Sequence, residues 1–354
     1  MNTKRHTILL CCLLITGLAQ GQTFEEYTEF PEPAGFSYYV LGTGLPDGRL
    51  ILWNGDTVFV QHGPGIDSFH PVASGYLGDP AFIALSPNGH DVILGQGFGD
   101  NLYSFDVNAP ADYTPASVIT TIPHYGATFL SETLLLIDAG NAGFTGSELV
   151  MLDLSATKGV AIHTVVSKDE SYEQAQEKGI IVEKPLFGWS AKLAYDEGNG
   201  LVYAMDSGQR EIRIFSLADI LNAFNTSTPL DWATDGVLMG AVGDYFSGGV
   251  AGIRPDSTLI IDGSEGYLQP GGIQLVDPNL ANPALAVILA TLDPAGTQGF
   301  HAAIYNKYTD RITAIVDGVP FGETGEVAQL PISSPLACMV LVLMLAYVGY
   351  RRTA

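Results

Sequence analysis

The feature that most constrains the fold of this chain is a weak pattern of short strands that recurs six times between residues 35 and 329. Each copy begins with a small residue and a short apolar strand, and a turn leads into a β-rich strand. A last strand follows after a variable loop. The second strand of each copy stops at a polar turn residue: Asn54, Gln96, Asp138, Asp206, Asp262 and Asp317. The first steps between these residues are about 42 residues, a period typical of propeller blades.

A single sheet of three or four strands cannot cover both of its faces, whereas a ring of such sheets can. We therefore expect an all-β fold, a six-bladed β-propeller, over residues 22–330. The pattern resembles six-bladed propellers of the NHL and YVTN kind. The alternative is a pair of β-sandwiches, which explains short strands but not the recurring turn residue.

One segment between the fourth and fifth copies departs from the strand pattern. Leu217, Ile220, Leu221 and Phe224 recur at helical spacing, which predicts a short helix between blades. Ser216 precedes the first of them and is a suitable N-cap.

The N-terminus carries an export signal. Residues 1–21 combine Lys4 and Arg5, a short apolar run and small residues at the cleavage positions, as secretory signal peptides do. An uncleaved anchor is the alternative, although the apolar run is short for a membrane span.

The C-terminal segment, residues 331–354, predicts a membrane anchor. An uncharged apolar run extends from Leu336 to Tyr350, and Arg351 and Arg352 follow it. Counted from Leu330, the run has the ~20 residues that cross a bilayer, and its basic end would remain in the cytoplasm. A buried final strand of the domain is the alternative.

The order of Leu330–Pro335, apolar run and arginine pair resembles C-terminal sorting signals of the PEP-CTERM type. Those signals consist of a short motif, a transmembrane helix and a basic tail, although no Pro-Glu-Pro stands beside the helix here. The resemblance implies a bacterial cell envelope, with the body anchored at the surface or released into an extracellular matrix after sorting.

Charge and cysteine usage exclude several classes of function. The net charge is −23, and the body between the basic termini is more acidic still, which disfavours nucleic acid as a partner. Cys11, Cys12 and Cys338 all lie in the apolar termini, so the body has no disulfide, thiolate nucleophile or cysteine metal site. It also contains no nucleophile elbow, phosphate-binding loop or paired histidine metal motif.

The residues immediately before the innermost strands should line one mouth of the central channel. Aromatic faces with a few polar groups favour ligand binding there, although the aromatic residues could equally plug the channel. These residues are Asp79, His124, Tyr125, Trp189, Lys192, Phe300 and His301. In the propeller lactonases and gluconolactonases, acidic and amide side chains hold a divalent metal at this mouth, but here only Asp79 is acidic.

A second, weaker hypothesis concerns calcium. Asp138 and Asn141 lie in a segment that loosely resembles a calcium loop but lacks its closing glutamate. The simpler interpretation is that such turn residues bond their own backbone. We expect no other cofactor.

Together these patterns predict a non-catalytic binding or scaffolding propeller at the cell surface, tethered to the membrane by its C-terminal helix. Its partner would be an extracellular protein, a polysaccharide or a small molecule. The alternative is an exported propeller enzyme, a lactonase-like hydrolase or a lyase, that works at the mouth of the channel.

Overall fold

The chain forms two compact units, residues 1–25 with 321–354 and residues 26–320, and every residue described below belongs to the second. The computed structural model describes residues 27–31, 41–55, 57–65, 68–74, 80–96, 101–108, 117–121, 126–140, 147–155, 161–167, 193–206, 211–240, 249–262, 272–292 and 300–316. Strands dominate these ranges, and they form six separate sheets.

Five of the sheets contain four or five strands each, and strands that follow one another along the chain pair antiparallel within them. The first sheet contains β2 (Leu41–Gly44), β3 (Leu50–Trp53), β4 (Thr57–Gln61) and β5 (Phe69–Ser74). The second contains β6 (Pro80–Leu85), β7 (Asp91–Gln96), β8 (Asn101–Asp106) and β9 (Ser117–Thr121). The third contains β10 (Gly126–Phe129), β11 (Leu134–Gly140), β12 (Ser147–Asp153), β13 (Ala161–Ser167) and β17 (Leu230–Asp231).

The fourth and fifth sheets follow the same plan. The fourth contains β14 (Leu193–Asp196), β15 (Leu201–Asp206), β16 (Glu211–Ser216) and β18 (Val237–Leu238). The fifth contains β19 (Gly249–Ile253), β20 (Leu259–Asp262), β21 (Ile273–Asp277) and β22 (Val287–Leu292), and the short helix η2 (Pro283–Leu285) precedes its last strand.

The sixth sheet, which we call the closing sheet, combines the two ends of the unit. It contains β23 (Phe300–Asn306), β24 (Arg311–Val316) and β1 (Tyr27–Pro31). β24 lies in the middle, and β1 pairs parallel with it, from Tyr27 opposite Ile312 to Pro31 opposite Val316. The third strand of this sheet is therefore the N-terminal strand β1.

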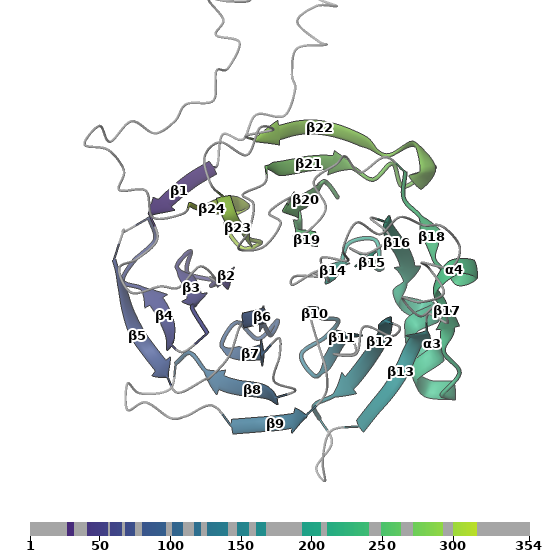
Figure 1. Cartoon of the computed structure of the whole chain (residues 1–354), viewed down its shortest axis with the longest axis horizontal. Helices are drawn as coiled ribbons and strands as arrows, with labels where there is room; N and C mark the ends of the chain where they lie inside the picture. The colour runs from purple at the N-terminus through teal and green to yellow at the C-terminus, as the bar shows by residue number, and fades with distance from the viewer. Residues whose placement is uncertain are drawn as a thin grey trace, which may run out of the picture. The chain divides into compact units, whose positions relative to one another are not determined.

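The first strand of each of the five larger sheets lies innermost, as does β23 of the closing sheet, and these six strands form a closed cycle of contacts. β2 contacts β6, and the contacts continue through β10, β14, β19 and β23 back to β2. Figure 1 shows the sheets arranged around this common axis, with the later strands of each sheet farther out. The predicted all-β propeller fold is therefore confirmed, with five blades of four or five strands and the closing sheet between the fifth and the first.

The core lies between neighbouring sheets, because each sheet covers a face of the next. The second strands are buried on both faces; all four residues of β3, for example, are buried. Apolar clusters join the first sheet to the second around Trp53 and Leu94, and the second to the third around Leu102 and Ile137. Because hydrophobic burial is the dominant favourable term in folding, these clusters are what holds the ring of small sheets together.

The axis is crowded where β2 meets β23. A Cβ atom on Gly42 would collide with Ile304, and one on Gly44 would collide with Asn306. Asn306 is buried and donates from Nδ2 to the carbonyl of Leu45 at 3.1 Å, which links the closing sheet to the first sheet. The innermost strand here, which pairs with β3, is Leu41–Gly44, and two of its four residues are glycines. Glycine is a poor strand former, so local preference concealed a strand that close packing requires.

The chain between β16 and β18, which both belong to the fourth sheet, forms a strap across the third and fourth sheets. Helix α3 (Leu217–Thr226) follows β16, β17 pairs with β13 of the third sheet, and α4 (Trp232–Asp235) leads back to β18 of the fourth. The predicted helix and its cap are confirmed, because the Ser216 hydroxyl accepts the Asp219 N–H at 3.0 Å. Ile220 is fully buried in a cluster shared by the third and fourth sheets.

A polar network attaches α4 to β16. The indole N–H of Trp232 donates to Oε1 of Glu211 at 2.7 Å, and Nε of Arg213 donates to the same oxygen at 3.0 Å. Arg213 also donates to the carbonyls of Ala233 and Gly236. The Glu211–Arg213 pair is shielded, with side chains 16% and 13% exposed, and each of the two side chains makes at least one further hydrogen bond. Buried polar groups that find partners in this way cost little.

Within the described ranges, no helix is long and apolar enough to cross a membrane. The predicted signal peptide (1–21) and the predicted anchor residues Leu336, Tyr350, Arg351 and Arg352 lie outside those ranges.

Candidate functional site

A hollow with both polar and apolar walls lies on the axis of the ring, where the innermost strands end. It has a volume of about 630 Å³, and a second hollow of about 100 Å³ lies between the innermost strands themselves. Every sheet contributes to the larger one, for example with Thr43, Leu85, Glu132, Glu197, Arg254 and Tyr308. This volume falls within the usual range for ligand pockets, about 300–1,000 Å³. We call it the axial cavity.

Tight turns after the innermost strands place most of its polar side chains. Five of these turns contain a residue with a positive φ angle, such as Gly89 (83°), Ser257 (68°) and Asp310 (53°). Side chains brace the backbone of the turns: Oδ1 of Asn306 accepts the Tyr308 N–H at 3.0 Å. Such local bonds are what Asp and Asn commonly provide in turns. Because they fix the backbone, the side chains at the mouth have defined positions.

Glu197 and two tyrosines form one side of the cavity. Burial raises the pKa of Tyr308, and the Glu197 carboxylate raises it further. The pKa of Tyr195 is raised by burial, by Glu197 and by Asp196. Both phenols therefore stay protonated at neutral pH and can donate hydrogen bonds. The ammonium group of Lys307 lies 5.3 Å from the centre of the Tyr308 ring, close enough for a cation–π contact.

An ion pair joins the fifth sheet to the closing sheet at the same mouth. Arg254 donates to both carboxylate oxygens of Asp310, from Nε at 3.1 Å and from a terminal nitrogen at 2.8 Å. The hydroxyl of Tyr305 donates to Asp310 at 2.8 Å. Two parallel bonds give such an arginine pair a fixed geometry. This pair thus holds Arg254 and Tyr305 in place at the wall of the cavity.

The fourth and fifth sheets are linked in a similar way. Nδ2 of Asn199 donates to Asp196 and to the hydroxyl of Ser257, both at 2.8 Å. Asp196 is buried, and its other oxygen accepts the Asn199 N–H at 3.1 Å. These bonds fix the turn that carries Glu197.

The mouth therefore offers carboxylates, cations, phenol donors and aromatic faces on a braced backbone. Glu132, Glu197 and Lys307 are exposed and can reorient toward a ligand. This arrangement is suited to holding a polar molecule through several hydrogen bonds. Among the described residues, the group of three side chains placed to hold a metal ion lies elsewhere, in the second sheet.

The mouth predicted from the sequence is at the opposite end of the innermost strands. Phe300 and His301, predicted to precede the innermost strand, are the first residues of β23, and their side chains are not described. The other predicted mouth residues lie outside the described ranges: Asp79, His124, Tyr125, Trp189 and Lys192. That ligand site stays a prediction.

The calcium hypothesis also stays a prediction. Asp138 lies in β11 opposite Gly126 and is buried, with 5% of its surface exposed. Asn141 lies outside the described ranges.

The mouth predicted from the sequence is formed by residues that precede the innermost strands, so the prediction did not include the axial cavity. A signal was present after them, in the turn sequences Pro87-Asn88-Gly89 and Pro255-Asp256-Ser257 and in the charged or aromatic residues around them. These turns are recognisable from sequence. The sequence does not show that these turns converge on one axis.

Comparison with known proteins supports the fold alone. No protein-family model matches this chain, and no curated protein matches it. A gluconolactonase from Xanthomonas campestris is similar in structure, with a TM-score of 0.54, 10% identity, and 84% of this chain and 86% of the other covered. A chain of the nidogen/laminin complex has a TM-score of 0.50 and 11% identity, with 78% and 84% covered. At such low identity, the likeness extends to the propeller fold and not to an activity.

Proposed function

We propose that this chain is an exported, membrane-tethered propeller that binds a compact polar ligand in its axial cavity and does not transform it. The observation that carries this proposal is the axial cavity itself, about 630 Å³ in volume and lined by every sheet. Its exposed carboxylates accept hydrogen bonds, its protonated tyrosines donate them, and its aromatic faces cover apolar parts of a ligand. A molecule rich in hydroxyl or amine groups, such as a sugar, fits this set best.

We also propose that the closing sheet acts as a sixth blade. Its strands β23 and β24 repeat the first two strands of the other sheets, and β1 supplies a third. Joining the N-terminal strand to the last sheet ties the two ends of a ring together, so that no blade has an unpaired neighbour.

Export and tethering are supported by the sequence of the two ends. The charged start and apolar run of residues 1–21 favour export, and the apolar run before Arg351 and Arg352 favours an anchor. Under this proposal the acidic body lies outside the cytoplasm of a bacterial cell, where its partner is a saccharide, a small molecule or an extracellular protein. Mass spectrometry of the mature protein would reveal whether either end is removed.

The binding proposal can be tested by screening the purified chain against mono- and oligosaccharides, amines and amino acids. Thermal shift would identify a ligand, and calorimetry would measure its affinity. Replacing Glu197 by Gln and Tyr308 by Phe should each weaken binding about tenfold, because each removes one polar contact. Asp219→Asn, which changes an exposed carboxylate on the distant helix α3, is the control and should bind normally. Unchanged affinity in both cavity variants would contradict the proposal.

The alternative function is an exported propeller enzyme, a lactonase-like hydrolase or a lyase, working at the mouth predicted from the sequence. The structural similarity to a gluconolactonase favours this alternative function. Purified protein would be assayed with lactones, esters and glycosides at saturating calcium. Turnover that disappears in both His124→Ala and His301→Ala would replace the binding proposal with this one.

A further inference from the structure

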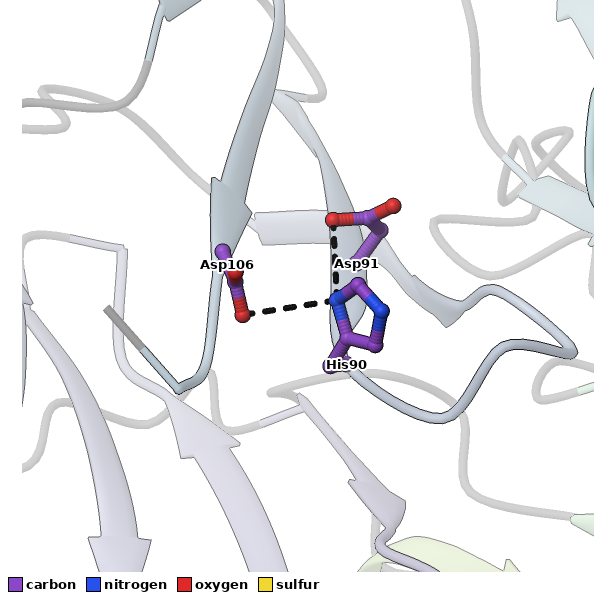
Figure 2. A group of neighbouring side chains, drawn as sticks. All are labelled: His90, Asp91 and Asp106. Atoms are coloured by element: carbon purple, nitrogen blue, oxygen red, sulfur yellow. Dashed lines mark ion pairs between the residues drawn. The ribbon is translucent and has the colours of Figure 1, made fainter.

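A second group of side chains lies apart from the axial cavity, at one end of the two central strands of the second sheet. It consists of His90, in the turn between β6 and β7, Asp91 at the start of β7, and Asp106 at the end of β8. One ligand atom from each lies within 4.8 Å of the others. Figure 2 shows the imidazole between the two carboxylates.

The distances within this group match those between the ligands of a metal ion. Nδ1 of His90 is 3.3 Å from Oδ1 of Asp91 and 3.4 Å from Oδ1 of Asp106. In a tetrahedral zinc site with bonds of about 2.0–2.1 Å, neighbouring ligand atoms are about 3.3 Å apart. One oxygen of each carboxylate lies within 4.8 Å of the other, so a shift of one carboxylate would bring all three atoms around one ion and leave a fourth position open.

The state of the ring nitrogen is an independent observation that points to a ligand. Nδ1 of His90 is shielded from solvent and makes no hydrogen bond, although it faces two carboxylate oxygens. A shielded polar atom without a partner costs free energy. A metal ion between the three groups would supply that partner and offset the repulsion between the two aspartates.

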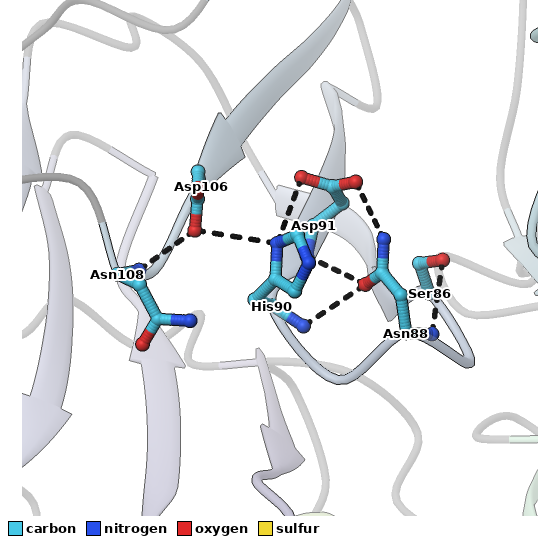
Figure 3. Close-up of polar contacts among 6 residues, drawn as sticks. All are labelled: Ser86, Asn88, His90, Asp91, Asp106 and Asn108. Atoms are coloured by element: carbon cyan, nitrogen blue, oxygen red, sulfur yellow. Dashed lines mark hydrogen bonds and ion pairs between the residues drawn. The ribbon is translucent and has the colours of Figure 1, made fainter.

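The surrounding turn holds the three residues in position before any ion arrives. Oδ1 of Asn88 accepts the backbone N–H groups of His90 and Asp91, both at 3.0 Å, and its Nδ2 donates to Oδ2 of Asp91 at 2.6 Å. The N–H of Asn108 donates to Oδ1 of Asp106 at 2.8 Å. Figure 3 shows these supporting bonds around the imidazole. Such supporting contacts orient metal ligands and commonly decide their affinity.

We propose that His90, Asp91 and Asp106 form a binding site for a divalent transition metal ion, with Zn²⁺ as the best fit. An imidazole nitrogen with two carboxylate oxygens favours zinc over calcium, which prefers a larger set of oxygen ligands. The side chains are 40–51% exposed, so an ion can reach the site directly from solvent. The ion would join the start of β7 to the end of β8. The turn between β6 and β7, which contains His90, also contains Pro87, and Pro87 lines the axial cavity.

The test is a zinc titration of the full-length chain, purified in mild detergent and stripped with a chelator. Calorimetry should find one ion per wild-type chain, and His90→Ala and Asp106→Asn should each weaken binding at least about tenfold. Zinc should also raise the melting temperature of the wild type and not that of His90→Ala, because an ion that binds only the folded state stabilises it.

Two matched controls make the result specific. Asp153 ends β12 as Asp106 ends β8, and its Oδ1 accepts the Ser155 N–H at 2.9 Å, so Asp153→Asn changes an equivalent carboxylate and should bind zinc normally. His62 and His70, whose ring centroids are 4.6 Å apart, form a pair of histidines away from the proposed site. Zinc binding that is lost in His62→Ala and kept in His90→Ala would overturn the proposal. No binding by the wild type up to about 1 mM zinc would overturn it as well.

Discussion

The strap and the closing sheet both join neighbouring sheets of the same ring, but they use different chemistry. The strap fills the space beside the third and fourth sheets with a helix whose apolar side chains enter their common core. The closing sheet contacts the first sheet through glycines and a buried asparagine, and the fifth through an ion pair. Where the chain can add an element, burial of apolar surface contributes most, and a polar network at α4 supplements it. Where its two ends must meet, close approach and directed polar contacts hold the sheets instead.

The largest expected effect is the loss of apolar contacts between helix α3 of the strap and the two sheets beneath it. Ile220→Ala should lower the free energy of unfolding by about 3 kcal/mol, because it leaves a cavity between α3 and two sheets. Asn222→Ala, on the exposed face of the same helix, should change it by less than about 0.5 kcal/mol. Urea denaturation measures both. If the two variants were equally stable, the strap would not be part of the core.

Close packing at the closing sheet should be nearly as sensitive. Gly44→Ala should cost about 1–3 kcal/mol, because the new methyl group collides with Asn306 and forces the first and closing sheets apart. Gly198→Ala is the matched control: its methyl group would meet only Asp196, at 3.4 Å, an ordinary contact. A wild-type melting temperature for Gly44→Ala would show that β2 and β23 are less tightly packed than described.

The ion pair should contribute less than either contact. Asp310→Asn should cost about 1–2 kcal/mol, because it removes the charge that Arg254 faces in a mostly shielded position. Asp47→Asn removes the same kind of partner from Arg49 in a more exposed pair and should cost at most about 0.5 kcal/mol. Thermal unfolding at low and high salt would compare them, and identical losses would mean that burial does not strengthen the Arg254 pair.

The smallest effect belongs to the start of the strap. Ser216→Ala removes the N-cap of α3 and should cost about 1 kcal/mol, whereas Ser216→Asp should retain most of the stability because its carboxylate can accept the same N–H. Chemical denaturation of both variants tests this. If Ser216→Asp were as unstable as Ser216→Ala, packing of the hydroxyl rather than capping would explain the loss.

The sites differ in how far they could be predicted. The turns that build the axial cavity are visible in the sequence, but nothing local indicates that Glu197 acts on Tyr308, more than 100 residues later. His90 and Asp91 are adjacent in sequence, whereas Asp106 joins them only because β7 and β8 pair with Asp91 opposite Asp106. The register between β7 and β8, which is a property of the sheet, therefore brings Asp106 next to His90 and Asp91.

The sequence by itself determined the strand pattern, the polar residues Gln96, Asp206 and Asp262 that end three of the second strands, and the helix that begins after Ser216. These are local properties, since turn chemistry, capping and periodicity depend on residues close together in the chain. Only the tertiary structure decided that β1 pairs with β24, that a glycine-rich strand lies at the axis, and that the ends of six innermost strands enclose a cavity. Each of these depends on contacts between residues far apart in sequence, where close packing overrides local preference.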